Sequence, residues 1–210
     1  MRVRNGRVVK KNNWRLDPGD YRAVPQSEIR LVRERPRDGT RHLITIAQLR
    51  RFIELLPEWG EVAIGLDAIL LDAATDCDGW YAPGGVAICA WEHDLWEWCS
   101  ADFVDEHREL LDLVAVQSVP LAESPEYREL VGSAASNQPD PTGYLELRWT
   151  EPQARAYQLL HILPHELGHH HDRMTSRRQR TIGRGERYAE AYANRVMRQV
   201  WPAYVRTFGL

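Results

Sequence analysis

Apolar residues recur every three or four positions in two segments of the first half of the chain. In residues 45–56 they share one helical face, with Thr45 at the position of an N-cap and Pro57 at the end of the pattern. Ser100 begins a second such pattern, which continues to residue 114. Both segments are therefore predicted to be helices that pack one face against a core.

A longer helical pattern begins at Thr150 and runs to about residue 172. Thr150 and Gln153 have the spacing of a capping box, in which the two side chains satisfy each other's backbone N–H groups. Pro164 interrupts the pattern, because proline lacks the N–H that would bond to residue 160. We expect a kink or a new helix start there, with His161 in the core or behind a site rather than acting as a ligand.

Strand-like segments occupy much of the remaining sequence. The first two flank Pro36-Arg37-Asp38-Gly39, a turn sequence, and are predicted to pair as a hairpin. The last alternates apolar and polar side chains and is predicted to be an edge strand, along which an extended peptide can bind. The segments are residues 29–35, 41–45, 62–71, 84–91 and 143–149. Together with the helices they predict an α+β fold, a small mixed sheet packed on helices.

Length and composition indicate one domain of ordinary size. The chain has 210 residues, of which 43% are hydrophobic and 27% charged, enough apolar material for a core. Residues 1–28 are polar and lack a sustained period, so they are predicted to form an irregular basic arm, and residues 29–210 a single domain. Residues 120–143 are rich in proline and small polar residues and are predicted to be a long surface loop.

The net charge of −3 conceals three blocks of different sign. Residues 1–51 carry 14 basic and 5 acidic side chains, residues 52–146 carry 2 and 20, and residues 147–210 carry 11 and 5. Such blocks either pair within the molecule or face different partners. The small total argues against a protein held on nucleic acid by bulk charge, which leaves binding through the arginine-rich residues 1–51 as a weaker alternative.

The cysteines and the N-terminus bear on the compartment. Cys77, Cys89 and Cys99 contain no C-x-x-C pair, and at least one of the three is unpaired, a usage typical of a reducing compartment. The start of the chain lacks the apolar stretch of a signal peptide, and no segment approaches the roughly 18 apolar residues of a membrane span. We therefore expect a cytoplasmic protein without a membrane segment. The sequence does not indicate its oligomeric state.

The third predicted helix contains His165-Glu166-Leu167-Gly168-His169, an H-E-x-x-H motif. Helix positions four apart lie about 40° apart and one turn along, so both imidazoles can reach one ion, with Glu166 beside them. Two histidine nitrogens suit Zn²⁺, and a carboxylate next to zinc-activated water can accept its proton. The motif predicts a zinc site with a general base. The alternative is a histidine-rich amphipathic helix without a metal.

A catalytic zinc ion needs a third protein ligand. After a polar segment the helical pattern resumes over residues 186–194. Two antiparallel helices joined by a turn bring a residue about 20 positions downstream back over the first helix. Glu190, which is 21 residues after His169, is a carboxylate in that position.

The stretches H-E-L-G-H-H-H-D and E-R-Y-A-E-A-Y resemble the zincin metallopeptidases of the glutamate-ligand type (gluzincins). The resemblance is greatest to the catalytic domains of lethal-factor-like toxin proteases. The E-x-x-A-N spacing from Glu190 to Asn194 is more loosely similar to that of cytoplasmic peptidases that act on phage or stress-response repressors. The resemblance covers about residues 160–198. It implies a zincin-like fold, in which the helix that follows the H-E-x-x-H helix supplies the third ligand.

Carried over residue by residue, the resemblance implies three zinc ligands, His165, His169 and Glu190, and Glu166 as the general base. Asp172 can orient a ligand histidine or pair with an arginine, and Asn194 can hydrogen-bond a ligand or lie on the helix surface. Many zincins also have a tyrosine or histidine that donates to the developing oxyanion. The tyrosines near the two helices are Tyr188, Tyr192 and Tyr157.

The sequence therefore predicts a zinc metallopeptidase, an endopeptidase acting on a protein or peptide substrate. The alternative is a catalytically silent zincin-fold module that binds a protein partner through the tryptophans in or near its acidic middle, which otherwise belong to the core. Glu166 favours the enzyme, because a metal site kept only for structure has no use for a base. The tryptophans are Trp80, Trp91, Trp96, Trp98 and Trp149.

Overall fold

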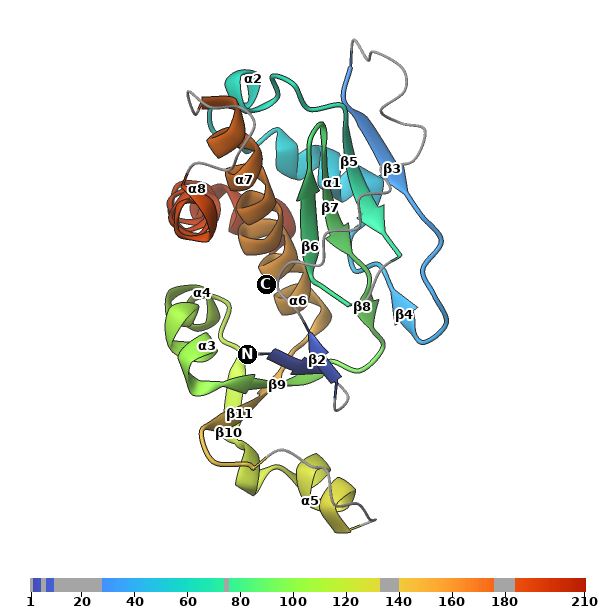
Figure 1. Cartoon of the computed structure of the whole chain (residues 1–210), viewed down its shortest axis with the longest axis vertical. Helices are drawn as coiled ribbons and strands as arrows, with labels where there is room; N and C mark the ends of the chain where they lie inside the picture. The colour runs from blue at the N-terminus through green and yellow to red at the C-terminus, as the bar shows by residue number, and fades with distance from the viewer. Residues whose placement is uncertain (1, 5–6, 10–27, 74–75, 133–139, 176–183) are drawn as a thin grey trace. The chain divides into compact units, whose positions relative to one another are not determined.

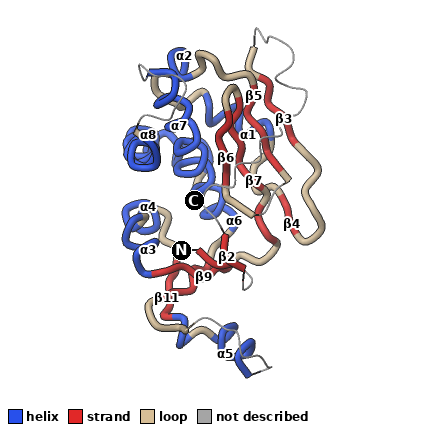
Figure 2. The backbone as a smooth tube through the Cα atoms, viewed as in Figure 1, coloured by secondary structure: helices blue, strands red, loops and turns tan. Residues whose placement is uncertain are grey.

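A computed structural model of the chain describes residues 2–4, 7–9, 28–73, 76–132, 140–175 and 184–210. Its helices and strands form a mixed α+β structure (Figures 1 and 2), which confirms the predicted α+β class. The chain divides into two compact units, each built from separate parts of the sequence. Unit 1 comprises Met1–Lys10 and Asp94–Ala154, and unit 2 comprises Lys11–His93 and Arg155–Leu210.

Unit 1 contains a five-stranded antiparallel sheet in the order β10-β11-β9-β1-β2. Its helices come from the sequence between β9 and β11, and Ser100 caps the first of them by accepting a hydrogen bond from the Phe103 N–H. The strands are β1 (Arg2–Arg4), β2 (Arg7–Val9), β9 (Trp96–Ser100), β10 (Gln117–Pro120) and β11 (Tyr144–Arg148). The helices are α3 (Ala101–Glu106), α4 (Arg108–Leu113), η2 (Leu121–Glu123) and α5 (Pro125–Gly132).

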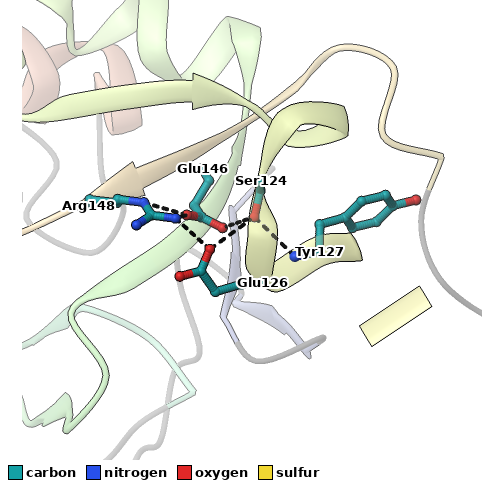
Figure 3. Close-up of polar contacts among 5 residues, drawn as sticks. All are labelled: Ser124, Glu126, Tyr127, Glu146 and Arg148. Atoms are coloured by element: carbon teal, nitrogen blue, oxygen red, sulfur yellow. Dashed lines mark hydrogen bonds and ion pairs between the residues drawn. The ribbon is translucent and has the colours of Figure 1, made fainter. Parts of the chain in front are cut away.

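Unit 1 contains a cluster of polar side chains around one buried carboxylate (Figure 3). Glu146 is fully buried on β11, where Ser124 donates a hydrogen bond to its carboxylate and the Arg148 Nε donates another at 2.8 Å. Arg148 also forms an ion pair with Glu126, and the Ser124 oxygen accepts a hydrogen bond from the Tyr127 N–H at 3.0 Å. A buried carboxylate with these partners is neutralised where it lies. The cluster therefore holds α5 to the sheet.

Unit 2 contains the predicted metal helix and a four-stranded mixed sheet in the order β3-β5-β7-β6. The first three strands are parallel, and β6 pairs antiparallel with β7 at one edge. The β6–β7 turn contains Gly84, whose φ of +84° lies in the left-handed region that favours glycine. The strands are β3 (Arg30–Arg33), β5 (Ala68–Asp72), β6 (Gly79–Ala82) and β7 (Gly85–Cys89), and a separate antiparallel pair is formed by β4 (Thr40–Arg41) and β8 (Trp91–Glu92).

The helices of unit 2 are α1 (Ile46–Ile53), α2 (Trp59–Val62), η3 (Gln158–Ile162), α7 (Leu163–Thr175) and α8 (Gly185–Phe208). Thr45 caps α1, as predicted, and it does so in a capping box, with hydrogen bonds in both directions to Gln48. α7 lies along β6 and β7 and packs against α8 (Figure 1). Buried apolar side chains between sheet and helices form the core, among them Phe52, Ile69, Leu71, Ile88, Leu167 and Val196.

Three predictions about strands and loops were wrong. Residues 29–35 and 41–45 do not pair as a hairpin, because β3 pairs with β5 and β4 with β8. β11 is not an edge strand, since it lies between β10 and β9. The predicted loop of residues 120–143 contains η2 and α5 in the part that the structure describes.

The predicted arm of residues 1–28 contains two short strands, β1 and β2, which pair with each other, and β1 also pairs with β9. Most of the remaining arm, residues 10–27, lies outside the described residues.

Among the helices of the described ranges, none is both long and apolar enough to cross a membrane. Of the five tryptophans in or near the acidic middle, three are buried, Trp91, Trp98 and Trp149, in agreement with a core role.

Candidate metal centre

The helix that carries the H-E-x-x-H motif is continuous from α6 (Glu151–Tyr157) through η3 into α7. It starts at the predicted capping box, where the Thr150 N–H donates to the Gln153 side chain at 2.8 Å. Its η3 segment is a π-helix, in which the Leu163 N–H donates to the Gln158 carbonyl. Pro164 follows at once and has no N–H to donate. The predicted irregularity is therefore a π turn, an element often found at functional sites, immediately before His165.

One side of α7 packs against the edge strand β6. A Cβ on Gly79 would lie 2.6 Å from Ile162 Cγ2 and 3.2 Å from Glu166 Cγ, so glycine permits this close approach. Two residues further along β6, the Tyr81 ring stacks on His169, with centroids 6.3 Å apart and planes 20° apart. The edge strand thus lies directly beside the motif, and Tyr81 restricts the orientation of the His169 ring.

The other helix of the site, α8, is held to the end of α7 by Asp172. The Asp172 carboxylate is fully buried and accepts hydrogen bonds from the Arg184 and Gly185 N–H groups at 2.8 and 3.0 Å and from the Arg184 Nε at 2.6 Å. Burial opposes ionisation of this group, but the Arg184 hydrogen bonds hold its pKa below the usual value. Of the two predicted roles for Asp172, the structure has the arginine pair, which fixes where α8 begins.

Two glutamates one turn apart on α8 face the histidines of α7. Glu186 Oε2 lies 3.2 Å from His165 Nε2, and Glu186 Oε1 lies 3.4 Å from His169 Nε2. The ligand atoms of these three residues all lie within 4.8 Å of one another. Hydrogen bonds to His165 and His169 hold the pKa of Glu186 well below its usual value. The Nε2 edges of both motif histidines therefore converge on one ionised carboxylate.

Glu190 faces a different edge of His165. Its Oε2 lies 3.2 Å from His165 Nδ1 and 3.8 Å from the Nε2 of His161. His161 is buried and stacks on Tyr157, with ring centroids 5.3 Å apart. The structure thus brings Glu190 to the site, as predicted, but sets it at the Nδ1 side of His165, whereas Glu186 occupies the Nε2 side.

Glu166 lies on the side of α7 that faces β6 and is 3% exposed. Burial raises its pKa to about 7, although the charges of His165 and His169 oppose the shift. Its buried Oε2 has no hydrogen-bond partner among the residues that the structure describes. A carboxylate with a pKa near neutrality can both accept and return a proton at physiological pH, as a general base must.

The three predicted oxyanion donors contact histidines outside the H-E-x-x-H motif. The Tyr188 hydroxyl shares a hydrogen bond of 2.7 Å with His171 Nδ1, and the Tyr192 ring also packs against His171, at 5.4 Å between centroids. His171 is two positions after His169, and so about 200° round the helix from it. The structure therefore places Tyr188 and Tyr192 at another face of α7, and Tyr157 beside His161 and Trp91. Asn194 is half-buried one turn beyond Glu190, and its hydrogen bond to a ligand stays a prediction.

Sequence reasoning missed Glu186 and Tyr81. The spacing of Glu186 and Glu190, four residues apart on a helix, was a signal that both carboxylates share one face. Tyr81 gave no such signal, because residues 76–84 have the composition of a turn.

Gly168 is the contact point between α7 and α8. A Cβ at this position would lie 2.8 Å from the Ala189 Cα and 3.1 Å from the Ala189 carbonyl oxygen, both backbone atoms. We expect Gly168→Ala to push α8 away and to lower the free energy of unfolding by about 1–3 kcal/mol, together with weaker metal binding. Gly60→Ala on α2 is the control, because a Cβ there has nothing within 4 Å. Equal stability of the two variants in urea unfolding would contradict the close contact.

No protein-family model, curated protein or solved structure matches this chain. Inferences about function therefore rest on the residues and their geometry.

Proposed function

We propose that the chain is a zinc metallopeptidase of the zincin type, which hydrolyses peptide bonds within a protein or peptide substrate. In this proposal His165, His169 and Glu186 hold the metal, Glu190 orients His165, and Glu166 is the general base. The proposal adopts the sequence prediction for the two histidines and the base. It differs from the prediction in the third ligand, for which the resemblance implied Glu190.

The observation that carries the proposal is the convergence of both motif histidines on Glu186. Zinc binds nitrogen and oxygen ligands at about 2.0–2.2 Å, and tetrahedral geometry then separates neighbouring ligand atoms by about 3.3–3.5 Å. The distances from Glu186 to His165 Nε2 and His169 Nε2, 3.2 and 3.4 Å, are close to this separation. The residues present therefore fit the metal.

Glu190 fits a supporting role. A histidine that binds zinc through one ring nitrogen usually donates the N–H of the other to a carboxylate, which fixes its tautomer and orientation. Glu190 lies within 3.2 Å of His165 Nδ1, the nitrogen on the opposite side of the ring from Glu186. Through this bond Glu190 keeps His165 Nε2 available for the metal.

In this proposal the metal and Glu166 have different roles in catalysis. Zinc in such a site acidifies water and polarises a carbonyl group as a Lewis acid. Glu166 accepts the proton that the attacking water loses and then gives it to the leaving amine, so each turnover restores the carboxylate. Its burial beside β6 keeps bulk water from competing for that proton.

The position of β6 at the edge of its sheet is the observation that favours a peptide as the substrate. It pairs with β7 on one side and is the last strand of its sheet in the described part of the chain. An extended peptide that adds to the other side of β6 by β-augmentation would pass next to Gly79, and therefore next to Glu166. In this proposal β6, rather than residues 143–149, is the edge strand along which the peptide binds.

The catalytically silent module remains the alternative. A buried carboxylate with its pKa raised to about 7 favours the enzyme, because an ionisable group in this environment costs stability and gives a binding module nothing in return.

The deciding experiment combines metal analysis with an unbiased peptide-library cleavage assay on the full chain. We expect one zinc ion per chain and cleavage at internal peptide bonds that a zinc chelator abolishes. One bound zinc without cleavage of any library member would support the silent module. Absence of bound metal after incubation with excess zinc would refute both.

A further inference from the structure

Two of the three cysteines lie in contact with each other, and neither belongs to the candidate metal-ligating residues. Cys77 precedes β6 and Cys89 ends β7, and their Sγ atoms are 3.6 Å apart. Each is 2% exposed, and Trp80 packs against both. Cys99 is buried on β9 in unit 1, whereas Cys77 and Cys89 belong to unit 2. The sequence alone had indicated only that at least one cysteine is unpaired.

We propose that Cys77 and Cys89 are a reversible oxidation site that forms a disulfide when the protein meets a peroxide. The thiolate of one cysteine attacks one oxygen of the peroxide and becomes a sulfenic acid as the O–O bond breaks, and the hydroxide released takes up the proton that the thiol had lost, which gives one water. The thiol of the other then attacks that sulfur, which forms the S–S bond and releases a second water. The two thiols lose two electrons and two protons in total, and one hydrogen peroxide is reduced to two water molecules.

The backbone holds the two cysteines in position for this reaction. The Cys89 N–H donates to the Asp78 carbonyl at 2.8 Å, and the Cys89 carbonyl accepts a hydrogen bond from Gln158 Nε2 at 2.9 Å. An S–S bond is about 2.05 Å long, so the sulfur atoms need to approach each other by roughly 1.5 Å, a distance that side-chain rotation and small backbone shifts provide.

The environment of the pair slows its oxidation. The hydrogen bond with Cys77 and burial raise the pKa of the Cys89 thiol well above its usual value. Because the thiolate is the reactive form, oxidation is slow near neutral pH and accelerates as the pH rises. A small peroxide also reaches buried thiols more readily than a protein disulfide does.

The position of the pair also gives the disulfide an effect on the proposed peptidase, and this part rests on the proposed function. The bond would tie the start of β6 to the end of β7, and β6 contacts Glu166 through Gly79. A shift of Asp78 and Gly79 changes the position of the edge strand relative to the base, and displacements near 1 Å lower rates by up to about 100-fold. Oxidation is therefore expected to lower peptide hydrolysis, and reduction by a dithiol to restore it.

The test treats the full chain with hydrogen peroxide, blocks the remaining thiols with an alkylating reagent and maps cysteines by mass spectrometry. We expect the wild type to lose two alkylatable thiols, with a Cys77–Cys89 linked peptide and Cys99 still free. Cys99→Ser should form the same link, whereas Cys77→Ser and Cys89→Ser should not. The link should raise the midpoint of thermal unfolding by roughly 5–10 °C.

Three free thiols after prolonged treatment, or oxidation of Cys77 and Cys89 to sulfinic acids without a link, would overturn the proposal. Formation of the link with unchanged hydrolysis would overturn its regulatory part only. Because the thiol map needs no activity, it remains decisive even if the chain cleaves no peptide.

Discussion

Glu166→Gln is expected to bind one zinc ion per chain with unchanged affinity and to lose peptide hydrolysis by about 10²–10⁴-fold. Glutamine has nearly the same shape but cannot accept the proton of the attacking water, and loss of a general base costs about this factor. The variant should fold, because Glu166 is buried with its pKa raised to about 7, so a neutral amide removes a desolvation cost. Metal content and cleavage rate, measured on the same preparation, check both parts.

The control for this prediction is His165→Ala, which should lose both zinc and hydrolysis, since His165 is placed among the ligands. A Glu166→Gln variant that hydrolyses peptides at the wild-type rate would eliminate Glu166 as the base. A variant that loses zinc as well as hydrolysis would instead indicate that Glu166 binds the metal.

The parts of the fold that follow from local sequence were predictable. Thr45 and Thr150 each cap a helix together with a glutamine three residues later, and both capping boxes are present because they involve only neighbouring residues. Pro164 marked an irregularity, although the sequence could not show that a π turn would accommodate it. Short-range hydrogen bonding and helical periodicity sufficed at these places.

Pairings between distant segments were not predictable. The turn at Pro36–Gly39 favoured a hairpin, but β3 gains a buried parallel neighbour, β5, which is more than 30 residues away in the sequence. Residues 76–84, which include β6, have the composition of a turn, because Gly79 is needed for the close approach of β6 to Glu166 and Gly84 for the left-handed backbone of the β6–β7 turn. The glycines that the close packing and the tight turn require are therefore the residues that made this segment look like a turn in the sequence.

In the candidate site, too, the arrangement within one helix was predictable from the sequence, and the packing between helices was not. His165, Glu166 and His169 are on one helix, so their relative positions follow from its geometry. The assignment of the α8 carboxylates depends on the offset between α7 and α8, which Asp172 and the Gly168–Ala189 contact set. Neither contact is encoded in the periodicity, so the sequence could place a carboxylate of α8 opposite the motif but could not choose between two glutamates one turn apart.

The matched variants Glu186→Gln and Glu190→Gln should distinguish the roles of the two carboxylates in zinc binding. We expect Glu186→Gln to weaken zinc binding by more than about 100-fold, because it removes the carboxylate on which both histidines converge. Glu190→Gln should weaken it by no more than about 10–100-fold, the usual effect of changing a group that only orients a ligand. Competition with a chromogenic chelator measures both affinities.

The two substitutions are comparable because each keeps the size of the side chain. Glu186 is about half exposed (49%), so its replacement leaves the core intact, and an exposed glutamate of α5, Glu129, provides a neutral control as Glu129→Gln. If Glu190 is the third ligand, as the resemblance to gluzincins implied, the order of the two affinities reverses. In that case Glu186, at the first turn of α8, would lie over the site without binding the metal, and hydrolysis in Glu186→Gln would be retained.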